Sequence, residues 1–534
     1  MTEATPGAVA LMARQAMRDA RVRTAAFAYL FLVYGYVQVR GYRGTYPTRA
    51  DRLSFAAGFG DNAGLRLLYG RPYDLLSVGG YVAWRVGGVL AVAAAAYGVL
   101  AAVRSLRAEE ESGRAELVLA LPVTRRDRDL AAGLAVCAGL VLLWLAEFGG
   151  LYAADAGGAG DAALLALAGS LTATVFAGWG AVTSQLAATR RGATGLGLLG
   201  VAAAFLLRVL ADTVTGMGWL GWVTPLGWAE RVRPFAGARP AVLVLPLVAT
   251  GALVLLAGRL AAGRDVGTSV LPARDTAPPR RELLGSPTAF ALRTQWGAIT
   301  AWLLSVAAIA FVLGIVSDSI SSADVPADVR RQLAKFGAGS ILTPLGYLGF
   351  VFVFVVVALS AYACSQAAAA RREEEGQLET VLAQPVTRTR WLAGRLTIAI
   401  LALAAVALTA GLAAWSGARA AGVHVALPRL VEAGANALPA AVLFLGVATL
   451  AVALVPRAGA AIAYGLLTAT FIWQLVGTLL GPPRWLLDLT PFAHVAPVPA
   501  KPFDAVAAGV LVVVGVVSGA LGITAFRRRD LRGG

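Results

Sequence analysis

The chain has 534 residues, of which 58% are hydrophobic and only 14% are charged, yet its formal net charge is +16. An ordinary soluble domain is about 25% charged, so this polar surface is too small to cover a soluble core, and a disordered chain would be poorer in apolar residues. The basic residues do not cluster on a soluble domain, which excludes a nucleic-acid-binding protein and leaves a polytopic α-helical membrane protein.

Twelve apolar runs follow one another along the chain, each near the roughly 20 residues that a helix needs to cross a bilayer. They lie near residues 24–40, 79–103, 131–153, 162–188, 193–215, 241–262, 296–317, 340–364, 391–416, 433–455, 457–480 and 504–526. The predicted fold is therefore all-α, with twelve transmembrane helices in two halves of six, at 1–262 and 291–534. The segment 263–290 is polar, basic and rich in proline, as is typical of a cytoplasmic linker.

Arginine placement predicts the orientation of the chain in the membrane. With the N-terminus inside, 28 of the 46 basic residues fall on cytoplasmic segments, in agreement with the positive-inside rule. We therefore expect both termini in the cytoplasm of a bacterial cell and the first apolar run to be an uncleaved span. Residues 8–20 place apolar and basic side chains on different helical sides, which predicts a short amphipathic helix at the membrane interface.

The strongest sequence signal is an internal repeat at an offset of 263 residues. The first acidic loop, residues 110–125, reads EESGRAELVLALPVTR, and the second acidic loop, residues 373–388, reads EEEGQLETVLAQPVTR. Eleven of these sixteen positions are identical, and each copy lies between the second and third apolar run of its half. Such a duplication indicates two copies of one unit, a plan that some transporters use.

Each acidic loop has the pattern of a short helix at the membrane surface. Gly113 allows a tight turn, the residues from Glu116 onward suit one or two helical turns, and Pro122 ends them. A short helix with an acidic side and an apolar side suits docking into a groove of a cytosolic partner. The alternative is an interfacial helix that only joins two spans, but the duplication favours docking.

These residues resemble the ABC-2 type permeases, most closely the duplicated actinobacterial group of polyketide-antibiotic exporters. The E-E-x-G-x-x-E-x-x-L-x-x-P-V-T-R element is similar to the family's first cytoplasmic loop, which contains the coupling helix. TPLGWAERVRPFAG (224–237) and RDVGTSVLPAR (264–274) are similar to the outer segment and the linker of the same group. The resemblance implies a permease with two six-helix ABC-2 type (type V exporter-like) repeats.

What the resemblance implies about function is export of a hydrophobic or amphipathic compound, such as an antibiotic, a drug or a lipid-like molecule. The expected partners are a cytosolic ABC ATPase in two copies, membrane lipid and the cargo. The residues that it marks for coupling to the ATPase are Glu110, Glu111, Gly113, Glu116, Pro122, Glu373, Glu374, Gly376, Glu379 and Pro385. The second loop has Gln384 and Trp391 where the first has Leu121 and Arg128, so the two docking surfaces are not expected to be equivalent.

The phosphate-cradling motif GxxxxGK[ST] does not occur in this sequence. We therefore expect no enzyme activity, cofactor or metal site in the chain itself, with ATP and Mg²⁺ bound by the separate ATPase subunit. Two histidines, His424 and His494, lack the spacing of a zinc site.

The main alternative is an ion-coupled secondary transporter with 6+6 helices. It needs acidic groups within the membrane as a relay. The candidate charged residues are Glu147, Asp212, Arg85 and Arg208, and Arg208 and Asp212 are four residues apart. We expect Arg208 and Asp212 to neutralise each other and Glu147 to reach water near the outer end of its span. A membrane enzyme and a non-transporting scaffold are weaker alternatives, since no catalytic constellation is visible.

Overall fold

The computed structural model describes residues 6–59, 66, 69–213, 216–271, 282–321, 343–376, 378–480 and 484–529. These residues form helices and connecting segments with no β-strand among them. They make two compact units, one built from the residues before Pro279 (unit 1) and the other from the residues after it (unit 2). The all-α prediction is confirmed.

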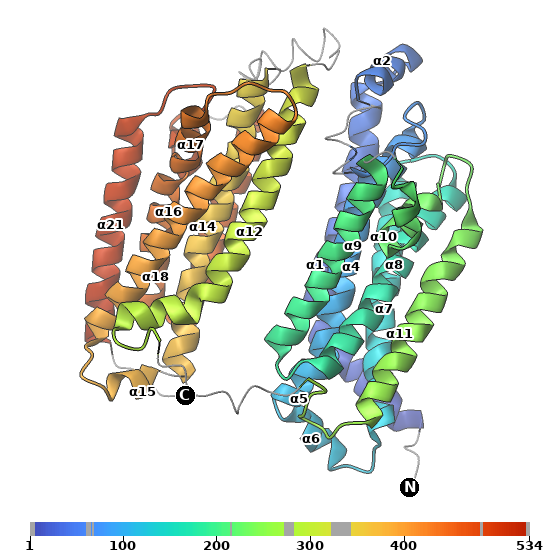
Figure 1. Cartoon of the computed structure of the whole chain (residues 1–534), viewed down its shortest axis with the longest axis horizontal. Helices are drawn as coiled ribbons and strands as arrows, with labels where there is room; N and C mark the ends of the chain where they lie inside the picture. The colour runs from blue at the N-terminus through green and yellow to red at the C-terminus, as the bar shows by residue number, and fades with distance from the viewer. Residues whose placement is uncertain are drawn as a thin grey trace. The chain divides into compact units, whose positions relative to one another are not determined.

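Unit 1 is a bundle of long helices with short helices at its two ends (Figure 1). Its helices are α1 (Pro6–Thr45), α2 (Arg49–Phe59), α4 (Val78–Val103), α5 (Glu109–Glu111), α6 (Arg114–Leu119), α7 (Arg125–Ala153), α8 (Ala159–Leu186), α9 (Arg190–Thr213), α10 (Pro225–Arg231) and α11 (Val244–Ala262). The predicted short helix over 8–20 is part of α1, because the helix continues without a break from Pro6 to Thr45.

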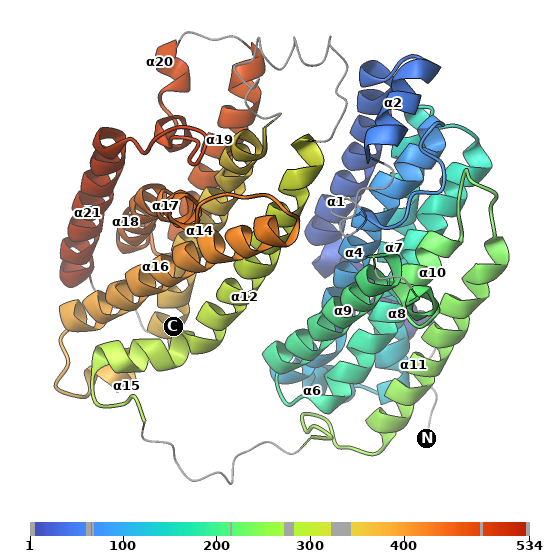
Figure 2. The same ribbon diagram turned by 45° about the horizontal axis from the view of Figure 1, so that its top comes forward.

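Unit 2 is also built from long helices and several short ones. Its helices are α12 (Pro287–Ser321), α14 (Pro344–Gly376), α15 (Leu378–Leu382), α16 (Arg388–Ala420), α17 (Leu427–Ala435), α18 (Leu438–Leu454), α19 (Gly459–Leu480), α20 (Arg484–Leu487) and α21 (Ala505–Arg528). Figure 2 shows α15 at one end of this unit and α20 at the other.

The same scheme of helix neighbours recurs in both units. In unit 1, α1 packs along α7, and α8 packs along both α4 and α11. In unit 2, α12 packs along α16, and α18 packs along both α14 and α21. Each pair occupies the corresponding place in its half of the sequence, so the duplication seen in the acidic loops extends to the packing of the bundles.

Small residues allow the closest of these helix contacts. A Cβ at Gly98 on α4 would overlap the carbonyl oxygen of Ala173 on α8, and one at Gly446 on α18 would overlap that of Gly515 on α21. Helices that meet at glycine approach until their backbones touch, a packing mode typical of membrane bundles. The Ala- and Gly-rich composition of the spans is therefore used for packing.

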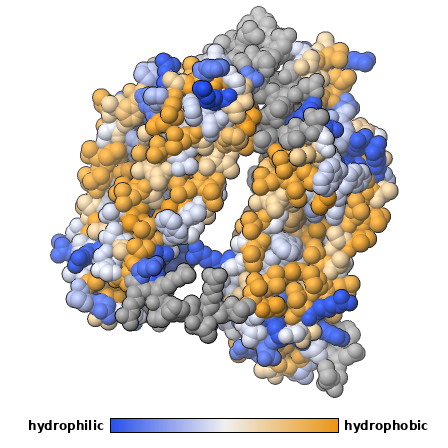
Figure 3. Space-filling model, viewed as in Figure 1, coloured by the Kyte–Doolittle hydropathy of each residue, from blue (hydrophilic) through white to orange (hydrophobic). Residues whose placement is uncertain are grey.

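Eleven helices in the described residues are long and apolar enough to cross a membrane. At the eleventh predicted run, α19 contributes a shorter apolar helical stretch, Gly459–Phe471. On the face shown in Figure 3, hydrophobic residues cover the middle of each unit and hydrophilic residues gather towards its ends. This distribution is that of a multi-pass membrane protein.

Candidate functional site

The first acidic loop folds into two short helical pieces at one end of unit 1 (Figures 1 and 2). After α4, residues Arg104–Ala108 form a π-helical turn that leads into α5. Gly113 then takes a left-handed backbone conformation with φ of 73°, which favours glycine, and α6 begins at the next residue. The predicted glycine turn and short helix are therefore present.

The start of α7 fixes the other side of this loop. Thr124 caps the helix by accepting a hydrogen bond from the backbone N–H of Asp127, and the Asp127 carboxylate accepts one in return from Thr124 N at 2.8 Å. This capping box holds the chain directly after Pro122, which is exposed. The repeated Pro-Val-Thr-Arg thus ends α6 and starts α7.

Glu110 is the anchor of the loop. Its side chain is only 1% exposed, and its Oε2 lies 3.1 Å from Arg107 Nη1 and 2.9 Å from Arg264 Nη2. Arg128 Nη2 lies 3.2 Å from Oε1 of the same carboxylate, and Arg125 lies at 3.7 Å. A buried carboxylate held by several arginines is tightly positioned. Glu110 therefore faces inward, and any role in docking acts through the shape of the loop.

The remaining acidic positions of this loop face outward. Glu111 is exposed and accepts a hydrogen bond from the backbone N–H of Arg190 at 2.6 Å. Glu116 on α6 is also exposed, and Leu117 beside it is 73% exposed. An exposed carboxylate next to a strongly exposed leucine matches the acidic and apolar surface that the sequence predicts.

The second acidic loop lies at one end of unit 2, where α14 ends at Gly376 and α15 follows. Glu374 pairs with Arg371 at 3.3 Å and with Arg529, while Glu373 pairs with Arg395. Ion pairs with arginines therefore also hold the acidic residues at the start of this loop in place.

Of the five positions of this loop that were predicted to couple to a partner, two are exposed. Glu379 on α15 is exposed, as is Pro385 after it. Glu379 thus corresponds to Glu116 in exposure as well as in sequence. The coupling role of both residues stays a prediction.

The arginines that hold the loops come from the same place in each unit. Arg264 lies just after α11 and Arg529 lies directly after α21, so each follows the last helix of its half. Reasoning from the sequence missed both residues, because they were counted only as charges of the linker and the tail. The signal that points to them is an arginine at the exit of the last span in both halves.

The loops differ where the sequences differ. Arg128 binds Glu110, whereas its counterpart Trp391 is buried and stacks on Phe526 of α21 with ring centroids 5.7 Å apart. Unit 1 therefore fixes its loop with an additional charge and unit 2 with an aromatic contact.

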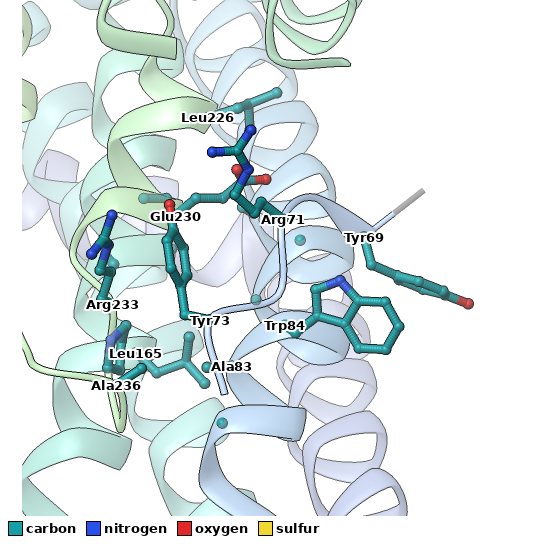
Figure 4. A pocket seen from close by; sticks show the side chains of 18 of the residues that line it. Tyr69, Arg71, Tyr73, Ala83, Trp84, Leu165, Leu226, Glu230, Arg233 and Ala236 are labelled. Carbon is teal, nitrogen blue, oxygen red and sulfur yellow. The ribbon is translucent and has the colours of Figure 1, made fainter. Parts of the chain in front are cut away.

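A second polar cluster lies in unit 1 at the end opposite the acidic loop (Figure 4). Arg208 Nη1 lies 2.9 Å from Glu230 Oε1, and both side chains are buried. Burial and then the nearby Asp212 carboxylate raise the pKa of Glu230, against the lowering effect of Arg208. Arg208 thus pairs with Glu230 of α10. The sequence predicted Asp212 as its partner and did not indicate Glu230.

The pocket beside this cluster has a volume of about 40 Å³ and is also lined by Glu147. Glu147 is only 1% exposed, so the expectation that it reaches water was wrong: α8 packs over its place on α7. A water molecule needs about 10–15 Å³, whereas drug-sized ligands occupy about 300–1,000 Å³. This pocket has room for a few waters and is too small for a drug.

Comparison with known proteins gives two matches over most of the chain. Residues 55–261 and 284–527 match the model of the family described as "Multidrug efflux system permease Rv1217c, C-terminal domain". The chain is also similar to the multidrug efflux system permease protein Rv1217c of Mycobacterium tuberculosis (strain ATCC 25618 / H37Rv). The two are 34% identical over 491 residues, covering 91% of this chain and 88% of that protein.

Proposed function

The chain belongs to the family of multidrug efflux permeases related to Rv1217c, and we propose that it is the transmembrane permease subunit of an ATP-driven exporter. It sits in the bacterial cell membrane with both termini in the cytoplasm. Its cargo is a hydrophobic or amphipathic compound, and ATP and Mg²⁺ are bound by a separate cytosolic ATPase, present in two copies. The family membership supports the predicted ABC-2 type plan.

The observation that carries this proposal is the pair of acidic loops. In each, an exposed glutamate, Glu116 or Glu379, stands on a short helix whose base is tied to the bundle by a buried or half-buried acidic residue. A fixed base and an exposed acidic tip suit transmission of a push from a docked motor protein. Two such loops in one chain match two ATPase subunits.

The arginine contacts define the helices to which such a force is transmitted. A force on α6 reaches Glu110 through Gly113, and from Glu110 it reaches α7 through Arg128 and the exit of α11 through Arg264. In unit 2, Glu374 passes a force on α15 to the exit of α21 through Arg529. Closure of the ATPase pair thus moves α4, α7 and α11 of unit 1 together, and α14 and α21 of unit 2 together.

Reconstitution tests the energy source. We expect proteoliposomes containing the chain and its ATPase to move a fluorescent drug only when ATP is supplied on the side of the acidic loops. An ATPase variant that cannot hydrolyse ATP serves as the control. Drug movement by the chain alone, driven by a proton gradient without any ATPase, would establish the secondary-transporter alternative instead.

Charge reversal at the loop tips tests the docking surface. We expect Glu116→Arg combined with Glu379→Arg to weaken binding of the ATPase subunit at least tenfold in a pull-down titration, because two exposed carboxylates become repulsive. Glu432→Arg on α17 is the matched control, since Glu432 is also exposed but lies away from the acidic loops. Unchanged binding in the double variant contradicts the docking assignment.

A further inference from the structure

A cavity of about 280 Å³ lies in unit 1 beside the first acidic loop and apart from the second polar cluster. Its walls come from the first half of α1, the end of α4, the helix α6 and the first turns of α7. Its volume is about seven times that of the pocket beside Arg208 and Glu230, and it is close to the lower end of the range for small-molecule sites.

One side of the cavity is apolar and aromatic. Phe27 and Tyr97 contribute rings whose centroids are 5.2 Å apart, and Ala132 and Val136 of α7 extend this surface. The hydroxyl groups of Thr24 and Tyr97 bond to each other at 2.9 Å, so the polar atoms of this wall are already satisfied. A ring-bearing apolar group fits such a wall.

Two of the lining arginines are neutralised by their neighbours. Arg114 pairs with Glu109 at 3.4 Å, and Arg128 pairs with Asp129 at 2.7 Å as well as with Glu110. Arg128 Nη1 is nevertheless buried with no hydrogen-bond partner among the described residues, so this part of the wall holds an unused donor.

The other two lining arginines are Arg23, which is half-buried, and Arg104, which is exposed. In the part of the chain that the structure describes, Arg23 and Arg104 form no ion pair. Arg23 donates only to the backbone oxygen of Asp19 at 2.9 Å. Arg23 and Arg104 line the same cavity, so two guanidinium groups without an acidic ion-pair partner among the described residues border one space. An anion bound between them would form charge-assisted hydrogen bonds with both.

We propose that this cavity binds an amphipathic organic anion, with its anionic group at Arg23 and Arg104 and its ring or short apolar body against Phe27 and Tyr97. The volume suits a compound of one or two rings, and a whole bilayer lipid with two long chains exceeds it. The anionic group is supplied either by such a compound or by a lipid headgroup that reaches in from the membrane surface.

The cavity also shares a wall with the docking helix. Ala115 and Val118 of α6 line it, so an occupant contacts the helix that carries Glu116. Binding thus stabilises one position of α6 relative to α1 and α7. Binding itself is independent of the transport role, whereas its effect on ATP hydrolysis rests on the proposed function.

Equilibrium binding of radiolabelled naphthalene-2-sulfonate to the purified full chain, in nanodiscs of phosphatidylcholine, tests the site. We expect saturable binding that Arg23→Gln with Arg104→Gln weakens at least tenfold and that Ala132→Phe, which fills the cavity, abolishes. Arg18→Gln and Ala138→Phe are the matched controls, because both residues are exposed and lie outside the cavity wall. Thermal unfolding of each variant verifies that it is folded.

The outcomes separate the proposals. Weaker binding of the probe by the wild type, but not by the arginine variant, when phosphatidylglycerol is added assigns the anion to lipid headgroups. No effect of that lipid assigns it to soluble organic anions. Equal affinity for the cation naphthylmethylammonium, or unchanged probe affinity in both variants, overturns the anion site. Intact probe binding together with a failure of ATP-dependent transport contradicts the proposed function only.

Discussion

Replacement of Glu110 by glutamine is expected to lower the free energy of unfolding of the chain by about 3–5 kcal/mol, because it leaves buried arginines without their common anion. Arg107, Arg128 and Arg264 all contact this one carboxylate. The neutral amide retains the shape of the side chain but neither its charge nor its four acceptor positions. Chemical denaturation in detergent, followed by tryptophan fluorescence, measures the loss.

Glu116→Gln is the control for this change. It removes the same charge from the same loop at an exposed position, so its effect on stability is expected to be small. We also expect Glu110→Gln to uncouple ATP hydrolysis from drug movement, since the loop loses its anchor. A Glu110→Gln protein as stable as the Glu116→Gln protein would show that the arginines find other partners.

Replacement of Gly446 by valine is expected to lower the free energy of unfolding through packing alone. A Cβ at this position overlaps the carbonyl oxygen of Gly515, so α18 and α21 must move apart along their contact. Overpacking of this kind costs about 1–3 kcal/mol or more, and backbone cannot rearrange as a side chain does. The melting temperature of the purified chain measures the change.

Gly465→Val is the matched control in the same unit. Gly465 lies on α19, and a Cβ there meets no atom within 4 Å. The same substitution is therefore expected to leave the melting temperature unchanged or to raise it slightly, since valine restricts the unfolded chain more than glycine does. Equal losses at Gly446 and Gly465 would mean that the cost does not arise from the contact between α18 and α21.

The sequence predicts the helices well because hydrophobicity over about 20 residues is a local property. The short helix after Gly113 and its end before Pro122 are predictable for the same reason, since turn residues act locally. The burial of Glu110 was not predictable in this way. It depends on Arg264, which is 154 residues away in the chain and is brought close only when α11 packs along α8.

The second polar cluster shows the same difference between local and long-range contacts. The pairing of Arg208 with Asp212 was expected from their spacing on one helix, whereas Glu230 comes from a separate short helix that folds back over the bundle. Glu147 was expected to reach water because of its place near a helix end. Its burial is a property of the neighbouring helices, which no single stretch of sequence contains.

Arg264 has a consequence for dividing this chain into separately expressed halves. The segment after α11 is attached to unit 1 by more than its charge: Val270 and Leu271 donate backbone hydrogen bonds to Gln185 and Leu186 at 3.0 and 3.1 Å. A half that ends with α11 at residue 262 would lack Arg264 and leave the Glu110 carboxylate short of a partner. A self-sufficient first half has to extend through residue 271, so the stretch between the last helix of one half and the first helix of the next is in part a structural piece of the half that precedes it.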